Sequence, residues 1–500
     1  MLGWFGDLGR LTWGFLYWNA RKSLFRIRGA SGAAPCQHPS DSGAAGETGC
    51  EACAGWSSRA RFRRLCPLLA AGAEGRAVCS VSAAQVRPFW GRAFSSLGLS
   101  LAAAYVAAVL GSFGVFRAIG YRVPLSAVAW PPAWHRVQKA RADYYFNMAL
   151  HAFSSGDARR GFLALSHVYV LDPDNVGAAR LLAQLTQVVN PDYSDEIYSQ
   201  LLLRHAGDFE DTAQAWFRSL LARGDFKAVG RLSARMLREG AAHVPAWTQG
   251  LLFAERMGAG SAEADALLSG KERIPGEARS VLSLAAALRA GTAAERVERL
   301  RVSLGGGSTA FEVYASLRWL EEFGRAADVA AFVEGAEGAA LGPYDREALK
   351  LDAYSALGWG AVERREISGL LEQGAPGSVA TLVSGHLVRH PNPAAARLAF
   401  ELLDAKPLAQ GPENVGPHVA LFCMAGVNGL GDRMKLESQV LVKLKAGEPA
   451  VWARARAFFE APEKGANASQ LLPLLGEIPL EVEYALVAHY RGAAAPAPAR

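Results

Sequence analysis

The residues with the clearest capacity for chemistry are cysteines gathered near the N-terminus. Five of the six cysteines lie between positions 36 and 79, and two of them form a single C-x-x-C pair. Two thiolates at this spacing bind one metal ion from a tight turn, and a zinc tetrahedron needs two more ligands. We therefore predict a structural zinc site, with His38 and Cys79 as alternate ligands to the favoured set Cys36, Cys50, Cys53 and Cys66.

The segment around these cysteines supports a metal, although other uses of the thiols stay open. Residues 29–58 are rich in Gly, Ser and Ala, so a metal would supply folding energy that the segment lacks. Incidental or redox-active thiols and an iron–sulfur cluster are the alternatives. Ala54 stands where covalently attached haem would need His. We expect the remaining cysteine, Cys423, to be a buried core residue.

The rest of the chain offers little further chemistry. His386 and His390 are four residues apart, but a metal pair would need a carboxylate and none is adjacent in sequence. We interpret them as residues at a helix C-terminus, before Pro391. The glycine-rich pieces at 305–307 and 427–433 lack the lysine of a phosphate loop, so we expect interhelical turns there. We expect no catalytic residues and no enzyme activity; an enzyme with an unrecognised active site is kept as an alternative.

One stretch that follows the cysteine-rich head has the composition of a membrane span. Residues 93–116 carry no charge and are bracketed by Arg92 and Arg117. A helix needs about 20 apolar residues to cross the hydrocarbon core. A soluble core helix of this length would usually carry a charged stripe. We therefore predict a transmembrane helix within 93–121.

The charge distribution predicts how the chain meets the membrane. Most of the net charge of +6 comes from arginines before residue 93, which places that head in the cytoplasm and the rest beyond the membrane, although Arg117 and Arg122 oppose this orientation. Basic and aromatic residues do not interleave, so we expect no nucleic-acid partner.

Residues 1–28 have an apolar, Trp-rich face and predict an amphipathic helix lying in the lipid surface, or packed on the span or on a partner. The abundance of Arg, Ala and Gly is typical of a GC-rich bacterium, so we expect a bacterial inner membrane, with residues 29–92 as a basic cytoplasmic segment.

The sequence that follows the predicted membrane span, from residue 122 onward, has a pattern that predicts helices. Residues 122–134 contain three prolines and form a connector; from 135 to about 490, apolar residues recur at three and four positions with Gly or Pro between the runs. Residues 142–175 place Tyr145, Ala149, the turn at Gly156, Gly161 and Pro173 in one pattern. Ala149 and Gly161 would let two helices approach closely, and Pro173 would end the second. Hairpins of similar length are indicated at 212–240, 314–336 and 348–376.

This pattern resembles the tetratricopeptide repeat, in the form found in bacterial membrane-anchored helical-repeat proteins. The match departs from the family at Gly161, where Ala is usual, and at Ala152, where an aromatic residue is usual. The resemblance implies an all-α fold in which antiparallel helix pairs stack into an α-solenoid over 135–490 and bind proteins on a concave surface. Residues 491–500 are Ala/Pro-rich, and we expect disorder there.

Together these features predict a single-pass, membrane-anchored scaffold that mediates protein–protein interactions at the membrane. The alternative is a metal- or redox-sensing membrane transducer that uses the cysteine-rich head. The identity of the partner and the oligomeric state are not specified by the sequence.

Overall fold

The computed structural model describes the chain in parts. It describes the backbone of Leu16, of 69–71, of 77–79 and of 87–494, except for residues 206, 208, 271–273, 306, 374–375 and 461–466; side chains are described mainly between 98 and 490. The chain divides into two compact units, residues 1–144 and 145–500, which are described separately. The interfacial helix expected at 1–28 lies outside the described residues apart from Leu16, which is helical.

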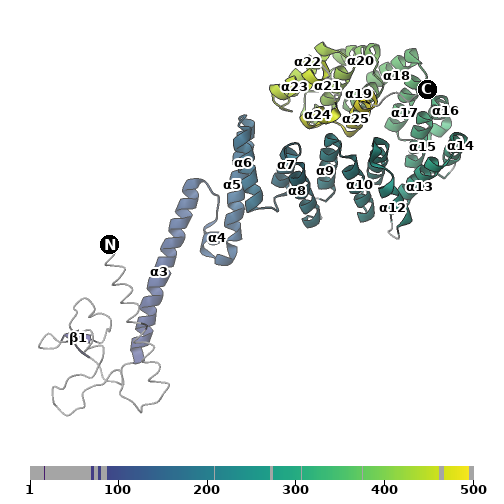
Figure 1. Cartoon of the computed structure of the whole chain (residues 1–500). Helices are drawn as coiled ribbons and strands as arrows, with labels where there is room; N and C mark the ends of the chain where they lie inside the picture. The colour runs from purple at the N-terminus through teal and green to yellow at the C-terminus, as the bar shows by residue number, and fades with distance from the viewer. Residues whose placement is uncertain are drawn as a thin grey trace. The chain divides into compact units, whose positions relative to one another are not determined.

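The first unit contains a short hairpin and a long helix (Figure 1). Strands β1 (Leu69–Ala71) and β2 (Ala77–Cys79) pair antiparallel, with Leu69 opposite Cys79. Helix α3 runs from Arg87 to Ile119 and precedes α4 (Leu125–Ala129), the 3-10 turn η3 (Pro131–Ala133) and α5 (His135–Ser154), which continues into the second unit. The segment Gly98–Ile119 of α3 is long and apolar enough to cross a membrane. The all-α expectation is thus correct for the described residues, apart from the hairpin.

The predicted proline connector is an ordered turn. Tyr121, Val123, Ala127 and Val128 are buried, and apolar side chains of α3 and α5 pack on them. Gly120 has a φ of +102°, and a Cβ at this position would lie 3.2 Å from the ring of Tyr144. The chain therefore reverses directly after α3 and packs back against it.

The second unit is built from helices that follow one another along the chain. Its earlier helices are α6 (Ala158–Leu171), α7 (Val176–Thr186), α8 (Pro191–Arg204), α9 (Phe209–Arg223), α10 (Phe226–Glu239), α11 (Val244–Ala254), α12 (Ala262–Ser269), α13 (Gly276–Ala290), α14 (Ala293–Ser303) and α15 (Ala310–Glu322). The later ones are α16 (Ala326–Glu334), α17 (Pro343–Ala356), α18 (Gly360–Gln373), α19 (Pro376–Arg389), α20 (Pro393–Ala405), α21 (Val415–Val427), α22 (Gly431–Lys443), α23 (Pro449–Glu460), α24 (Ala468–Leu471) and α25 (Leu480–Ala494). Most consecutive helices pack against each other, and odd-numbered neighbours such as α15, α17 and α19 also contact one another.

Several of the turns between these helices share one geometry. A glycine with φ between 69° and 81° ends one helix, and the next residue donates its N–H to a carbonyl five residues back, as Asp157 does to Ala152 at 2.9 Å. This is the Schellman cap, in which glycine avoids the strain of the left-handed region. The glycines that share it are Gly156, Gly224, Gly240, Gly324, Gly358 and Gly429.

A close helix approach follows the first of these turns. A Cβ at Gly161 would lie 2.6 Å from the ring of Phe153, so the small residue is needed there, as expected.

The C-terminal helix packs back on much earlier helices. The Tyr484 ring on α25 lies 4.4 Å from that of Phe253 and 6.3 Å from that of Phe217. The Arg218 guanidinium donates to the carbonyl of Ile478 at 2.7 Å. Because α25 continues to Ala494, the disorder expected from residue 491 is wrong for 491–494. Residues 495–500 lie outside the described range.

Candidate functional site

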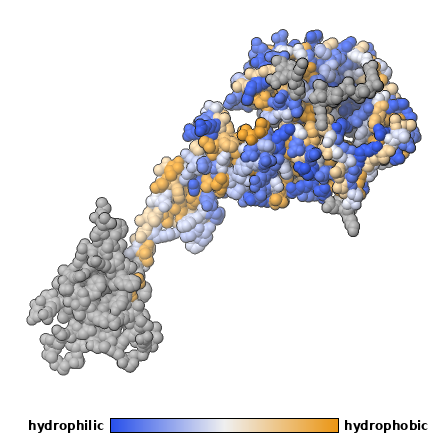
Figure 2. All heavy atoms as spheres, viewed as in Figure 1, coloured by the Kyte–Doolittle hydropathy of each residue, from blue (hydrophilic) through white to orange (hydrophobic). Residues whose placement is uncertain are grey.

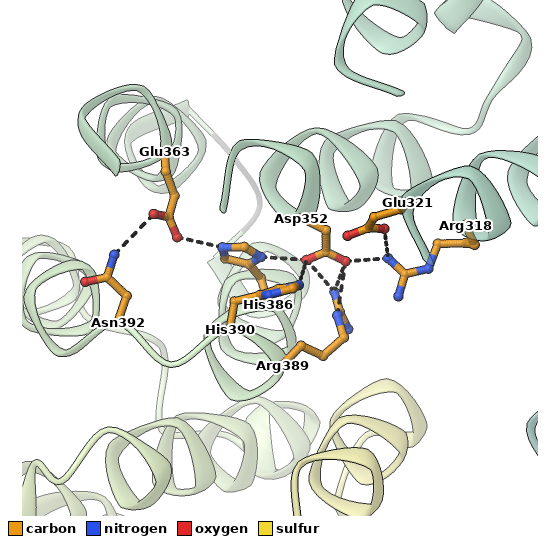
Figure 3. Close-up of polar contacts among 8 residues, drawn as sticks. All are labelled: Arg318, Glu321, Asp352, Glu363, His386, Arg389, His390 and Asn392. Atoms are coloured by element: carbon orange, nitrogen blue, oxygen red, sulfur yellow. Dashed lines mark hydrogen bonds and ion pairs between the residues drawn. The ribbon is translucent and has the colours of Figure 1, made fainter. Parts of the chain in front are cut away.

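Charged side chains meet in the interior where α15, α17, α18 and α19 come together (Figure 3). Asp352 and His386 are fully buried, and Glu363 is nearly so. Burying a charge is costly unless it is paired and hydrogen-bonded. The contacts of these side chains therefore decide what the cluster can do.

Asp352 is the centre of the network. Its Oδ2 accepts from Arg318 Nη1 at 2.6 Å and from Arg389 Nε at 3.1 Å. Its Oδ1 lies 2.6 Å from Nδ1 of His386. Burial alone would raise the pKa of this carboxyl, but Arg389, Arg318 and His386 hold it well below its usual range. Asp352 is therefore ionised.

His386 bridges two carboxylates. Its Nδ1 faces Asp352, and its Nε2 lies 2.8 Å from Oε1 of Glu363. The second oxygen of Glu363 accepts from Asn392 Nδ2 at 3.1 Å. Burial would lower the pKa of His386, but the hydrogen bonds to Asp352 and Glu363 raise it. An imidazolium that donates from both nitrogens fits this arrangement, because each neighbour is a carboxylate oxygen.

Two further groups at the edge of the network respond differently to burial. His390 Nε2 lies 3.5 Å from Asp352, yet burial lowers the pKa of His390 to about 4 and keeps its ring neutral. Glu321 accepts from Arg318 at 3.0 Å, and burial raises the pKa of its carboxyl to about 7. The charge of the network is therefore nearly balanced.

The three central residues occupy equivalent positions along the chain. Arg318 precedes Asp352 by 34 residues, and Asp352 precedes His386 by 34 residues. They lie on α15, α17 and α19, which contact one another in this order. Residues one repeat length apart lie side by side when helix pairs stack regularly. The network is thus a ladder across three alternate helices, which we call the 34-residue ladder.

The same residues could hold a metal ion. Ligand atoms of Asp352, His386 and His390 all lie within 4.8 Å of one another. Bonds of about 2.0–2.1 Å in a zinc tetrahedron separate ligand atoms by about 3.3 Å. The 2.6 Å between Asp352 and His386 is a hydrogen bond, so a metal would have to displace this proton and widen the contact. The arginines on Asp352 would also oppose a cation, and the polar groups are satisfied without one.

A cavity opens beside the ladder. It is an open cavity of about 210 Å³ between α11, α15, α19 and α25, and three guanidinium groups line it: Arg256, Arg318 and Arg389. Trp319 and Tyr484 supply part of its apolar wall. Asp352 fixes two of these guanidiniums, and Glu322 pairs with Arg256 at 2.7 Å. Guanidinium groups held in this way favour carboxylate or phosphate groups.

The predicted zinc ligands fall elsewhere. Cys36, His38, Cys50, Cys53 and Cys66 lie outside the described residues, and only the backbone of Cys79, at the end of β2, is described. Cys423 is a buried residue of α21, as expected, and burial raises the pKa of its thiol.

His386 and His390 do lie at the C-terminal end of α19, as expected, but they are not without carboxylate partners. Carboxylates do reach them, from Asp352 on α17 and Glu363 on α18. One feature of the sequence could have indicated the contact: Asp352 and His386 are 34 residues apart. This spacing predicts a contact only if the helices are assumed to repeat every 34 residues.

Comparison with models of protein families, with curated proteins and with solved structures found no match, so the function has to be argued from the geometry of the chain.

Proposed function

We propose that this chain is a single-pass membrane protein whose helical array is a tetratricopeptide-like solenoid that binds other proteins. The observation that carries the proposal is the 34-residue ladder. Its offset equals the length of the tetratricopeptide repeat, and it recurs twice, from Arg318 to Asp352 and from Asp352 to His386. Gly324 and Gly358, which share the same cap, are also 34 positions apart.

The surface of α3 supports the membrane anchor. Only 6% of its most apolar window is buried, and Leu101 is 63% exposed. Figure 2 draws much of this helix in the colours of hydrophobic residues. An apolar surface of this kind is unfavourable in water, at about 25 cal/mol for each Å². Lipid would cover it, with the basic head in the cytoplasm and the array in the periplasm of a bacterial inner membrane.

The cavity beside the ladder is the docking place that we favour. Its three guanidiniums and its aromatic wall suit a partner segment that combines an acidic group with an apolar side chain. The ladder's role would be positional: it sets the register of α15, α17 and α19 and holds Arg318 and Arg389 at the cavity wall.

Binding fits the ladder better than catalysis. His386 is fully buried and both of its nitrogens contact carboxylates, so it has no path for exchanging a proton with a substrate. A zinc-binding or redox-active head remains the second proposal, and it would add a sensing function to the same anchored platform.

Photocrosslinking in native membranes tests the proposal. A crosslinker at Gln249, which lines the cavity, should capture a discrete set of proteins, and Arg256→Glu should reduce that yield because it reverses a charge on the cavity wall. Arg235→Glu is the matched control, since Arg235 pairs only with Glu239 on the same helix among the described contacts. Equal yields from the two variants would contradict binding in this cavity.

A further inference from the structure

We infer that the partner segment places its acidic side chain on Arg296, in a second cavity that joins the cavity beside the ladder. The inference rests on the proposed binding function and specifies which cation binds the acidic group. It also makes the docking place a groove with two subsites, one apolar and one charged.

The second cavity adjoins the first. It has a volume of about 420 Å³, and Leu252, Arg256 and Trp319 line both cavities. Its other walls come from α13, from α14 and from the end of α15, and they include Arg296 and Phe323. Because Trp319 is a wall of both cavities, one partner segment can contact both by crossing this side chain.

Salt bridges balance two of the cations in the second cavity. Arg289 donates to Glu255 at 2.7 Å, and these two residues are again 34 positions apart. Arg289 also pairs with Asp265. Arg256 pairs with Glu322 at 2.7 Å. The charges of Arg256 and Arg289 are therefore already compensated by carboxylates of the chain.

Arg296 is the cation of this cavity whose charge is not compensated. None of the ion pairs found among the described residues includes it, and its Nε is buried without a hydrogen-bond partner there. Its Cζ lies over the ring of Phe323, 5.8 Å from the ring centroid. A buried donor without an acceptor costs free energy, which an incoming acceptor recovers. An anionic group therefore gains most at Arg296.

The first cavity suits the apolar part of the segment. Its ladder arginines are occupied, since Arg318 and Arg389 donate to Asp352 at 2.6 and 3.1 Å. Most of its wall is aromatic, from Phe253, Phe311, Tyr314, Trp319 and Tyr484. Pockets of this kind hold the large apolar side chains that anchor protein interfaces.

The charges around Arg296 favour a carboxylate over a phosphate group. Glu255 and Glu322 also line the second cavity. They would repel a phosphate group, which carries about −1.5 to −2 charges at pH 7. A carboxylate carries one charge and can accept from two N–H groups of a guanidinium at once. The expected ligand group is therefore the side chain of Asp or Glu.

The arrangement of the helices sets the spacing in the partner. Helices α11 and α15 line both cavities, whereas α19 and α25 line only the first and α13 and α14 only the second. The two subsites are thus about one helix apart, which is about 8–10 Å. An extended segment advances about 3.3 Å per residue. The acidic residue should therefore lie about three positions from the apolar one.

Peptide selection on the full chain in nanodiscs tests this assignment. A phage-displayed library of random short peptides is the probe, and the enriched peptides are sequenced. Their affinities for the parent, for Arg296→Gln and for Arg299→Gln are then measured by fluorescence anisotropy. Arg299 is the matched control, because it is exposed on the same helix. Each peptide is also made with its acidic residue replaced by the corresponding amide.

We expect the enriched peptides to share an acidic residue about three positions from an aromatic or large aliphatic one. Arg296→Gln should weaken their binding by about tenfold or more, and Arg299→Gln should not. The amide peptide should bind the parent as weakly, and Arg296→Gln should weaken it no further, because both changes remove one contact.

Two other results separate the inference from the function on which it rests. Enriched peptides that bind Arg296→Gln as tightly as the parent would overturn the inference and leave segment binding standing. A selection that enriches no peptide would instead overturn both the groove and the proposed docking of a partner segment.

Discussion

Glu483 gives a quantitative test of how the C-terminal helix is packed. Its carboxyl group is 2% exposed on α25, and its Oε2 has no hydrogen-bond partner among the described residues. Burial raises the pKa of this group to about 8, against the opposing charge of Arg218. The ordinary pKa of glutamate is 4.5, so folding changes the proton affinity of this group strongly.

The sign of the effect follows from linkage. The folded chain holds this proton more tightly than the unfolded chain, so the stabilisation is full below pH 4.5 and is lost as the pH rises to about 8. Between pH 5 and pH 8 the free energy of unfolding should fall by about 3 kcal/mol from this group alone. Glu483→Gln keeps the shape of the protonated acid and cannot ionise, so the variant should lose this pH dependence.

Urea denaturation of the full chain in detergent, followed by circular dichroism at several pH values, measures the effect. The difference in stability between Glu483→Gln and the parent should grow by about 3 kcal/mol in favour of the variant from pH 5 to pH 8. Glu481→Gln is the control, because Glu481 is exposed on the same helix. If Glu483→Gln and the parent changed equally with pH, the buried placement of Glu483, and with it the packing of α25, would be refuted.

Three further outcomes are expected. Asp352→Asn should lower the free energy of unfolding by about 3–5 kcal/mol in the same assay, because it leaves buried cations unpaired; a loss below 1 kcal/mol would argue against the ladder. Gly250→Ala should cost about 1–3 kcal/mol, since its Cβ would lie 2.7 Å from the ring of Phe217, whereas Gly230→Ala, whose nearest neighbour is at 3.6 Å, should cost little. Metal analysis should find zinc bound to the purified chain and lost in Cys50→Ser; a metal-free parent with reactive thiols would remove the zinc prediction.

Much of the local structure could be predicted because it depends on neighbours in sequence. Gly156 was expected in an interhelical turn, and the hairpins expected at 212–240 and 348–376 turn at Gly224 and Gly358; all three glycines have the positive φ that such a turn needs. Helices were likewise expected from residue 135, and α5 begins at His135. The spacing of apolar residues predicts the helices, and the positions of the glycines predict the turns between them.

The long-range contacts could not be predicted in the same way. The ladder joins Arg318, Asp352 and His386. Other helices separate α15, α17 and α19 along the chain, so no pattern within one segment of sequence brings the three residues together. The packing of Tyr484 on Phe253 depends on the return of α25 across more than half of the array. Patterns near each residue indicate a helix and its buried face, but not which distant helix covers it.

Alkaline extraction of native membranes tests the central claim most directly. The full chain should stay in the membrane pellet, and a chain lacking residues 98–119 should move to the soluble fraction while keeping its helical circular dichroism. Release of the full chain by the alkaline wash would contradict the membrane-anchored array proposed here.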